Sequence, residues 1–348
     1  MKRTFSLLAV CIVVLAWLGI SLFTPQGIDP IAESQIELTK VVDETTFKLT
    51  NKGELYRVDA GTGKWHYHDT VFDPEGMLAS YRTEGDATYR ISPETNQSFA
   101  TKKQFIEGFE DLPIGVEGTR KLIGFERGWG ALTLQSPATP GVSDYVELRR
   151  QIIEEGASFI DASIAPDDSK VRSGTRSLKC VAPPCSSDMI CTKSSIASPL
   201  MYFRQNDDFW FRGYFHAESS RPYAIMDLEC EWIKEHAGIR ICIDEKGLLG
   251  VELKALDKPK YLQLGDNPIA FPLGQWVEVK AHFRLSHKDD GIIQLWQDNV
   301  LIVDTNGVTL PLERAIYSSL EVGISAHSYG DKRCELWIDD LEISQHRF

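Results

Sequence analysis

GQWVEVKAHFRLS, residues 274–286, is the stretch that decides the fold. Its apolar and charged residues alternate with a period of two, which is typical of an antiparallel strand with one buried and one exposed face. The apolar positions are Val277, Val279, Ala281, Phe283 and Leu285. The stretch therefore predicts a half-buried strand.

The residues that follow continue in the same manner. Short apolar runs are separated by turn residues, and Asp298-Asn299 between two such runs favours a tight hairpin, because both residue types tolerate a positive φ. No helical periodicity interrupts them, so this part of the chain is predicted to be all-β. The runs are IIQLWQ (292–297), VLIVD (300–304), LEVGISAHS (320–328) and CELWIDDLEIS (334–344).

These motifs resemble a known group of proteins. Trp276, GIIQLWQDN (291–299), VGISAHS (322–328) and WIDDLEIS (337–344) are similar to the C-terminal half of concanavalin A-like jelly rolls, which include laminin-G-like domains, lectins, glucanases and polysaccharide lyases. SGTRSLKC (173–180) and DDFWFRGYFHAES (207–219) fit the same pattern. The resemblance implies an antiparallel jelly-roll β-sandwich over residues 105–348. It implies little about function, since this fold hosts binding, catalysis and scaffolding alike.

The composition limits the kinds of molecule that the folded domain is expected to bind. The 348 residues are 43% hydrophobic and carry a formal net charge of -13. Beyond Lys2-Arg3 there is no basic run. Nucleic acid is therefore excluded as an expected partner, and so is an anionic membrane surface for the folded domain.

The N-terminus carries an uncharged segment, Phe5 to Phe23, directly after Lys2-Arg3. As a helix it would span about 28 Å, close to the hydrocarbon thickness of a bilayer. We expect residues 1–24 to form a cytoplasmic tip and a transmembrane anchor, with the bulk of the chain periplasmic or extracellular. The alternative is a signal peptide cleaved near Gly19-Ile20-Ser21.

Between this segment and the sandwich the chain changes character. Residues 25–40 read as a linker, and residues 41–100 as a small β-rich region of short alternating runs. His66 and His68 share a strand face, which fits an exposed polar face better than a metal site that lacks a third ligand. Residues 143–156, within the predicted sandwich, are the one helical candidate after the N-terminal segment; this helix is predicted to begin at Ser143 or Asp144 and to end at Gly156.

Six cysteines follow the N-terminal segment, an even number that permits disulfides outside the cytoplasm. A hairpin that places Ile233 opposite Ile239 would bring Cys230 opposite Cys242. The resemblance implies that Cys180 and Cys334 lie near each other, and Cys185 and Cys191 would then close a small loop. Free buried thiols and a zinc site remain alternatives.

A row of polar and aromatic side chains on residues 207–219 is the candidate ligand site. Trp210, Arg212, Tyr214 and His216 alternate with a buried apolar face. Trp and Tyr could stack on sugar rings while Arg212 binds a carboxylate or sulfate. In a lyase, Tyr214 or His216 would remove the proton next to a uronate carboxylate. A packed or interfacial face is the alternative.

Acidic residues offer two further sites. Asp227, Glu229 and Glu231 would project from one strand face, as a glycosidase requires, although the spacing departs from the pattern of glycosidases with this fold. The resemblance also implies a structural calcium ion held by Glu110 together with Asp339 and Asp340, since carboxylate oxygens suit Ca²⁺. Solvated turns are the alternative for that group.

The sequence as a whole predicts a membrane-anchored, extracytoplasmic, lectin-like β-sandwich. We expect it to be a non-catalytic binding or scaffolding module for a glycan or a partner membrane protein. Two alternatives stay open, an accessory structural subunit of a membrane-protein complex and a polysaccharide lyase or glycosidase.

Overall fold

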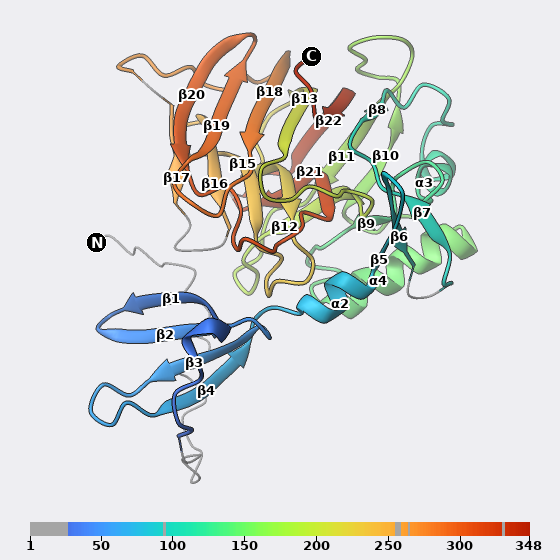
Figure 1. The fold of residues 1–348 in the computed structure, drawn as a ribbon. Coiled ribbons are helices and arrows are strands. Elements are labelled where there is room, and N and C mark those ends of the chain that lie inside the picture. Colours follow the sequence, from blue (N-terminus) through green and yellow to red (C-terminus); the bar gives the residue numbers. More distant parts are fainter. Residues whose placement is uncertain (1–26, 93–94, 255–258, 264, 329–330) are drawn as a thin grey trace.

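The computed structural model describes residues 27–348, apart from 93–94, 255–258, 264 and 329–330. Two large antiparallel sheets pack face to face (Figure 1). Phenylalanines such as Phe209, Phe211 and Phe283 on one sheet and aliphatic residues such as Leu228 and Val322 on the other are fully buried between them. The predicted all-β jelly-roll sandwich is thereby confirmed.

The first large sheet has eight strands. Seven lie in the order β10-β11-β22-β13-β18-β19-β20, and β8 pairs with β22 beside this path. The strands are β8 (Phe105–Glu107), β10 (Ser163–Asp167), β11 (Ser177–Ala182), β13 (Asp208–Ala217), β18 (Trp276–Arg284), β19 (Gly291–Gln297), β20 (Val300–Gly307) and β22 (Cys334–Ser344).

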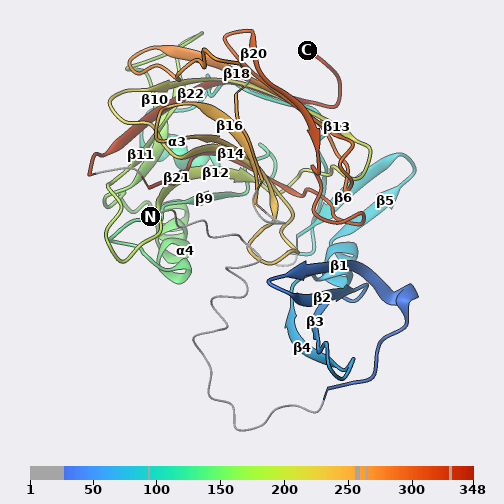
Figure 2. The same ribbon diagram turned by 90° about the vertical axis from the view of Figure 1, so that its left-hand side faces the viewer.

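The second large sheet has seven strands in the order β17-β16-β15-β14-β21-β12-β9. Figure 2 shows the two sheets as curved layers, with the N-terminal strands beneath them. The strands are β9 (Ala131–Thr133), β12 (Thr192–Ser198), β14 (Ala224–Glu229), β15 (Gly238–Ile243), β16 (Leu249–Leu253), β17 (Lys260–Tyr261) and β21 (Ser319–His327).

The strands predicted from residue 274 onward are all present. The β19–β20 hairpin turns at Asp298 and Asn299, whose φ values are 48° and 66°. Both lie in the left-handed region that a type I′ turn needs, so the predicted turn is confirmed.

The N-terminal part forms two smaller sheets joined by a short helix. A four-stranded sheet comprises β1 (Ile36–Val42), β2 (Thr45–Thr50), β3 (Glu54–Val58) and β4 (Trp65–Thr70), preceded by a 3₁₀ turn at Glu33–Gln35. Helix α2 (Pro74–Ala79) then leads into a three-stranded sheet of β5 (Tyr81–Glu84), β6 (Ala87–Ile91) and β7 (Ser98–Ala100).

The four-stranded sheet is attached to the sandwich through a turn between β14 and β15. Phe72 is 1% exposed and forms a β-bridge with Ile233. The Asp73 backbone N–H donates to the Trp232 carbonyl at 2.9 Å, and Lys234 N–H donates to the Val71 carbonyl at 2.8 Å. These bonds fix the turn against the N-terminal part.

Helices α3 (Val116–Leu122) and α4 (Val142–Arg150) are the longest helices of the described sandwich. A π-helical turn, Gln151–Glu155, extends α4 to Gly156, which adopts the left-handed conformation with φ 72°. This residue ends the helix as predicted, because glycine adopts a positive φ without steric cost.

The predicted fold class needs one correction. It included a transmembrane helix, and among the described residues no helix is long and apolar enough to cross a membrane. The segment for which that helix was predicted, residues 5–23, lies outside the described part of the chain.

The predicted disulfides are also corrected, because all six cysteines of the sandwich are free thiols. The β14–β15 register pairs Leu228 with Ile239, so Cys230 bonds back to Ala237 and Cys242 lies opposite Ala224. The expected pairing of Cys230 with Cys242 assumed a different register and is wrong. Cys180 and Cys334 do lie on neighbouring strands, although Cys180 faces Leu336 and Cys334 faces Ala182. Cys185 and Cys191 lie in the loop before β12.

Candidate functional site

A row of directly opposed residues crosses the outer face of the seven-stranded sheet from edge to edge. Each member faces the next in the strand register, and the members point away from the buried aliphatic side chains of the same strands. We call it the charged row. It consists of Lys260, Glu252, Arg240, Asp227, Glu321, Ala197 and Ala131.

Opposite charges alternate along most of this row. Arg240 donates to both oxygens of Asp227, at 2.7 and 3.2 Å, and Lys260 lies 3.2 Å from Glu252. The Glu252 carboxylate also accepts the hydroxyl of Tyr223. Each charge in this part of the row therefore has a partner on a neighbouring strand.

Side chains beside the row complete the network. Lys193 lies 3.7 Å from Glu321, which also accepts the Ser195 hydroxyl. Lys254, just after β16, is bonded to Glu229 and lies 3.8 Å from Asp227. Buried charges are stable only when paired in this way, because an unpaired ion inside a protein costs several kcal/mol.

The carboxylates of this network have opposite pKa shifts. Burial raises the pKa of Glu321, and the nearby charge of Lys193 only partly offsets it. Burial would also raise the pKa values of Asp227 and Glu229. The charges of Arg240 and Lys254 outweigh burial at Asp227, and the charge of Lys254 and the hydrogen bond with His236 outweigh it at Glu229, so both pKa values lie below the ordinary range. The environment thus favours the protonated form of Glu321 and the ionised forms of Asp227 and Glu229.

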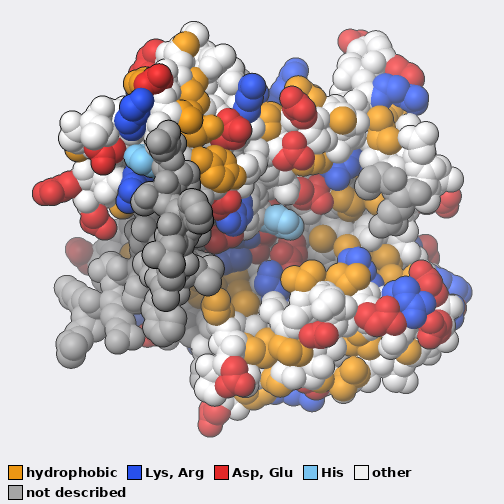
Figure 3. Space-filling model, turned by 90° about the horizontal axis from the view of Figure 1, so that it is seen from below, with side chains coloured by type: hydrophobic (Ala, Val, Ile, Leu, Met, Phe, Trp, Pro, Cys, Tyr) orange, Lys and Arg blue, Asp and Glu red, His pale blue; other side chains and the backbone are white. Residues whose placement is uncertain are grey.

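A cavity of about 450 Å³ opens at the β9–β12–β21 end of the row. Its floor contains small side chains, Ala131, Ala197, Thr133 and Ser319. Glu229, Lys193, Lys254 and Glu321 also line it. Helix α4 forms one wall through Tyr145, Val146 and Arg149, and the 231–236 turn forms another. Figure 3 shows acidic and basic side chains gathered in a hollow near the middle of this side of the molecule.

The 231–236 turn forms part of the cavity wall and is hydrogen-bonded to the N-terminal region. Glu235 and His236 have φ values of 62° and 49°, a conformation that costs non-glycine residues free energy and that often accompanies functional sites. His236 Nδ1 lies 3.6 Å from Glu229, and this interaction raises the pKa of the imidazole. A second cavity of about 340 Å³ lies between the turn and residues 70–73.

Three carboxylates in the network could hold a metal ion, since oxygens of Asp227, Glu229 and Glu321 lie within 4.8 Å of one another. Their charge is already balanced by Arg240, Lys254 and Lys193. A cation would have to displace these partners, so we interpret the group as an ion-pair network.

The predicted ligand row lies elsewhere, on the outer face of the eight-stranded sheet. Trp210 stacks on the His282 ring with centroids 4.0 Å apart, and Arg212 pairs with Glu342. The Tyr214 hydroxyl donates to Glu278 at 3.0 Å.

His216 completes that row, and its ring lies against Trp276 and Trp337, with centroids 5.6 and 5.7 Å away. Every member of the row therefore contacts side chains of its own sheet, and none lines the 450 Å³ cavity. A ligand role for these four residues stays a prediction.

The residues predicted to bind calcium gather around one loop, residues 172–175. Glu110 accepts the backbone N–H of Thr175 at 2.7 Å, and Asp339 accepts that of Arg172 at 2.8 Å. Asp340 accepts the Ser173 hydroxyl at 2.8 Å. Burial, with a contribution from the Asp340 charge, raises the pKa of Asp339 to about 6.

The residues considered for a glycosidase divide between two places. Asp227 and Glu229 share the outer face of β14, as predicted. Glu231 lies beyond the strand end and pairs with Arg90 of β6 at 3.0 Å. The carboxylates near Glu229 are those of Asp227 and of Glu321 on β21, and the latter is distant in the sequence.

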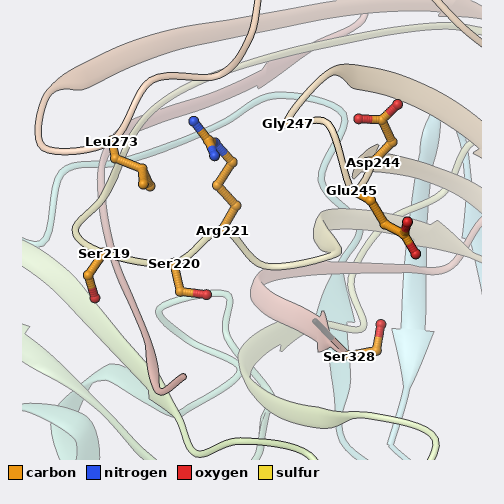
Figure 4. A pocket seen from close by; sticks show the side chains of 8 residues that line it. All are labelled: Ser219, Ser220, Arg221, Asp244, Glu245, Gly247, Leu273 and Ser328. Carbon is orange, nitrogen blue, oxygen red and sulfur yellow. The ribbon is translucent and has the colours of Figure 1, made fainter. Parts of the chain in front are cut away.

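A further pocket of about 430 Å³ lies at another end of the sandwich. Figure 4 shows Asp244 and Glu245 to one side of Arg221 and Leu273 to the other. Arg221 donates to the Phe271 carbonyl at 2.5 Å, and Asp244 accepts backbone N–H groups of its own turn. These bonds shape the local loops.

Sequence reasoning missed most of the charged row. Arg240 and Glu252 each interrupt a run of apolar residues, in GIRICI (238–243) and GVEL (250–253), and Lys254, beside the row, follows the second run. Charged residues at alternate positions of otherwise apolar strands were the available signal, because such residues are seldom buried without partners.

No protein-family model and no curated protein matches the chain. Among solved structures, an endo-β-1,4-glucuronan lyase from the fungus Trichoderma reesei is 12% identical, with a TM-score of 0.46 and coverage of 62% of this chain and 91% of that chain. A cellulose-induced protein is 16% identical, with a TM-score of 0.42 and coverage of 54% and 88%. The alginate lyase Aly36B is 9% identical, with a TM-score of 0.42 and coverage of 72% and 99%. These likenesses assign no activity to this chain, and the two-sheet jelly-roll architecture rests on its own strand topology.

Proposed function

We propose that this protein binds a glycan chain in the α4 cavity, at the Glu321–Ala197–Ala131 end of the charged row. The observation that carries the proposal is the register itself, which aligns one polar residue after another across the sheet and ends in the cavity over Ala197 and Ala131.

The chemistry of the cavity fits such a ligand. Polar side chains that line it, such as Thr133, Arg149 and Lys193, can hydrogen-bond vicinal sugar hydroxyls, and the Tyr145 ring on the cavity wall can stack on a sugar face. Alanines at the cavity floor leave room that larger side chains would fill. Because the ion pairs already hold the row in place, little side-chain entropy is lost on binding.

Blocking the cavity floor tests the proposal. Ala197→Trp places a large ring where a glycan would lie, and we expect it to reduce glycan affinity at least tenfold. Affinity for a panel of neutral and acidic polysaccharides would be measured by affinity electrophoresis and titration calorimetry of the full chain. Arg212→Gln on the opposite sheet is the control and should bind as the unchanged protein does.

The opposite pattern of binding in these two variants would contradict the proposed site. Loss of binding in Arg212→Gln with retention in Ala197→Trp would move the site to the Trp210–His216 row. A folded protein that binds no member of the panel would remove the proposal altogether.

Cleavage of the bound glycan is a second candidate. Oxygens of Glu229 and Glu321 lie within 4.8 Å of each other, near the roughly 5–5.5 Å carboxyl separation of retaining glycosidases. Their pKa values are shifted in opposite directions, as an acid and a nucleophile require. Incubation with each bound polysaccharide should then release new chain ends, and Glu321→Gln should stop the release without abolishing binding. An unchanged chain length would leave binding as the sole function.

We also infer that Glu110, Asp339 and Asp340 hold calcium with the 172–175 loop. The support is their convergence on one loop, with oxygen atoms as the ligands that Ca²⁺ prefers. Calcium should raise the melting temperature relative to a chelator-treated sample, and Asp340→Asn should remove that increase. Equal melting temperatures with calcium and with chelator would count against the site.

A further inference from the structure

Arg149 differs from the other basic residues that line the α4 cavity. Lys193 is paired with Glu321, and Lys254 with Glu229. The Arg149 guanidinium has no ion-pair or hydrogen-bond partner among the described residues, although the residue is only partly exposed. It lies one helical turn after Tyr145, so both side chains project from the same face of α4 into the cavity.

Three acidic residues of the cavity are paired with other cations and not with this guanidinium. Glu229 and Glu321 pair with lysines, and Glu231 pairs with Arg90. The cavity therefore combines a balanced ion-pair network on its floor with one unused cation on its wall. A guanidinium without a partner can bind an anionic group, and an aromatic ring beside it can pack on the flat apolar face of the sugar that carries this group.

We propose that Arg149 is a specificity-determining residue that binds an acidic group, a carboxylate or sulfate, on the glycan while Tyr145 stacks on the same sugar ring. This inference rests on the proposed function, and it names the ligand class, an acidic glycan. Neutral chains would lie on the same floor without the contact to Arg149.

Matched pairs of oligosaccharides that differ only in this group test the inference. A β-1,4-linked glucan and its C6-carboxylate counterpart form one pair, and a mannan and a mannuronan of equal length form another. We expect the unchanged protein to prefer the acidic member, and Arg149→Ala to weaken that member roughly tenfold to a hundredfold. Affinity for the neutral member should change less than about twofold in the same variant.

Two further variants distinguish a direct contact between Arg149 and the glycan from an effect of the net charge of the protein. Arg150→Ala is the matched control, since Arg150 is the next residue and pairs with Glu147, Glu154 and Glu155 on the outside of the helix. It removes the same charge and should leave the preference unchanged. Arg149→Lys keeps the charge but loses the bidentate geometry, and it should restore only part of the preference.

The outcomes distinguish this inference from the function on which it rests. Equal affinity for acidic and neutral chains, unchanged in Arg149→Ala, would overturn the role of Arg149 and leave glycan binding intact. The same loss in Arg149→Ala and Arg150→Ala would also overturn it, because the effect would then be one of net charge. A protein that binds neither member of any pair would overturn the proposed function as well.

Discussion

Lys254 is bonded to the buried carboxylate of Glu229 and lies near that of Asp227, so its removal leaves Glu229 without its main partner while Asp227 keeps Arg240. We expect Lys254→Met to lower the free energy of unfolding by about 3–5 kcal/mol, which is typical of breaking a buried ion pair on one side. Urea unfolding followed by tryptophan fluorescence would measure the change.

Lys260→Met is the matched control for that variant. Lys260 belongs to the same network, but its side chain is 46% exposed, so water screens its pairing with Glu252. We expect a loss of less than about 1 kcal/mol. Equal losses in the two variants would show that burial does not set the strength of these pairs.

Asp339 gives the protein a pH dependence of a particular sign. Its folded pKa of about 6 lies above the ordinary value of 3.8, because the buried carboxyl is protonated more readily in the folded state. Its contribution to stability is therefore complete below pH 3.8 and is lost as the pH rises through about 6.

Asp339→Asn should remove this component. The difference in melting temperature between the unchanged protein and the variant should then vary with pH between about 4 and 6 and be constant above that range. The measurement requires a chelator, since a bound cation would hold the carboxylate ionised. A constant difference over the whole range would mean that Asp339 titrates normally.

At the scale of elements, the sequence was sufficient to predict where the strands lie but not which strands pair or in which register. The period-two alternation of residues 276–284 and the turn chemistry of Asp298-Asn299 are local, and both are found in the structure. The Cys230–Cys242 pairing failed because it required the register of a hairpin, which depends on contacts beyond the two strands.

The charged row also shows that local sequence does not reveal which strands lie side by side. Its members come from strands that begin at Ala131, Thr192, Ala224 and Ser319, among others, and the topology alone brings them into line. Asp227 and Glu229 could be singled out because they share one strand. Glu321 could not be joined to them, because nothing local indicates that β21 lies beside β14.

The turn between β14 and β15 couples the N-terminal part to the cavity, and Phe72 contacts it through the bridge with Ile233. Phe72→Ala should loosen the turn, so that hydrogen exchange at residues 232–236 accelerates and glycan affinity falls, while exchange in β13 and β22 stays slow. Val41→Ala, at a position that is 61% exposed, is the control and should change neither. Unchanged exchange in Phe72→Ala would show that the sandwich alone holds the turn.

At the scale of the molecule, the N-terminal part and the sandwich share one hydrophobic core. Leu49, Phe72 and Met77 belong to the same buried cluster as the residues between the two large sheets. We therefore expect a single cooperative transition in calorimetry, with equal van't Hoff and calorimetric enthalpies. Two separated transitions would show that the four-stranded sheet unfolds independently.

The position of β22 has a consequence for how the protein is made. This strand, Cys334–Ser344, lies inside the eight-stranded sheet between β11 and β13, while β21 lies between β14 and β12 in the other sheet. Both sheets thus lack an inner strand until residues 319–344 have left the ribosome. The earlier strands must wait with unpaired edges, which favours slow, post-translational folding and a need for chaperones during synthesis.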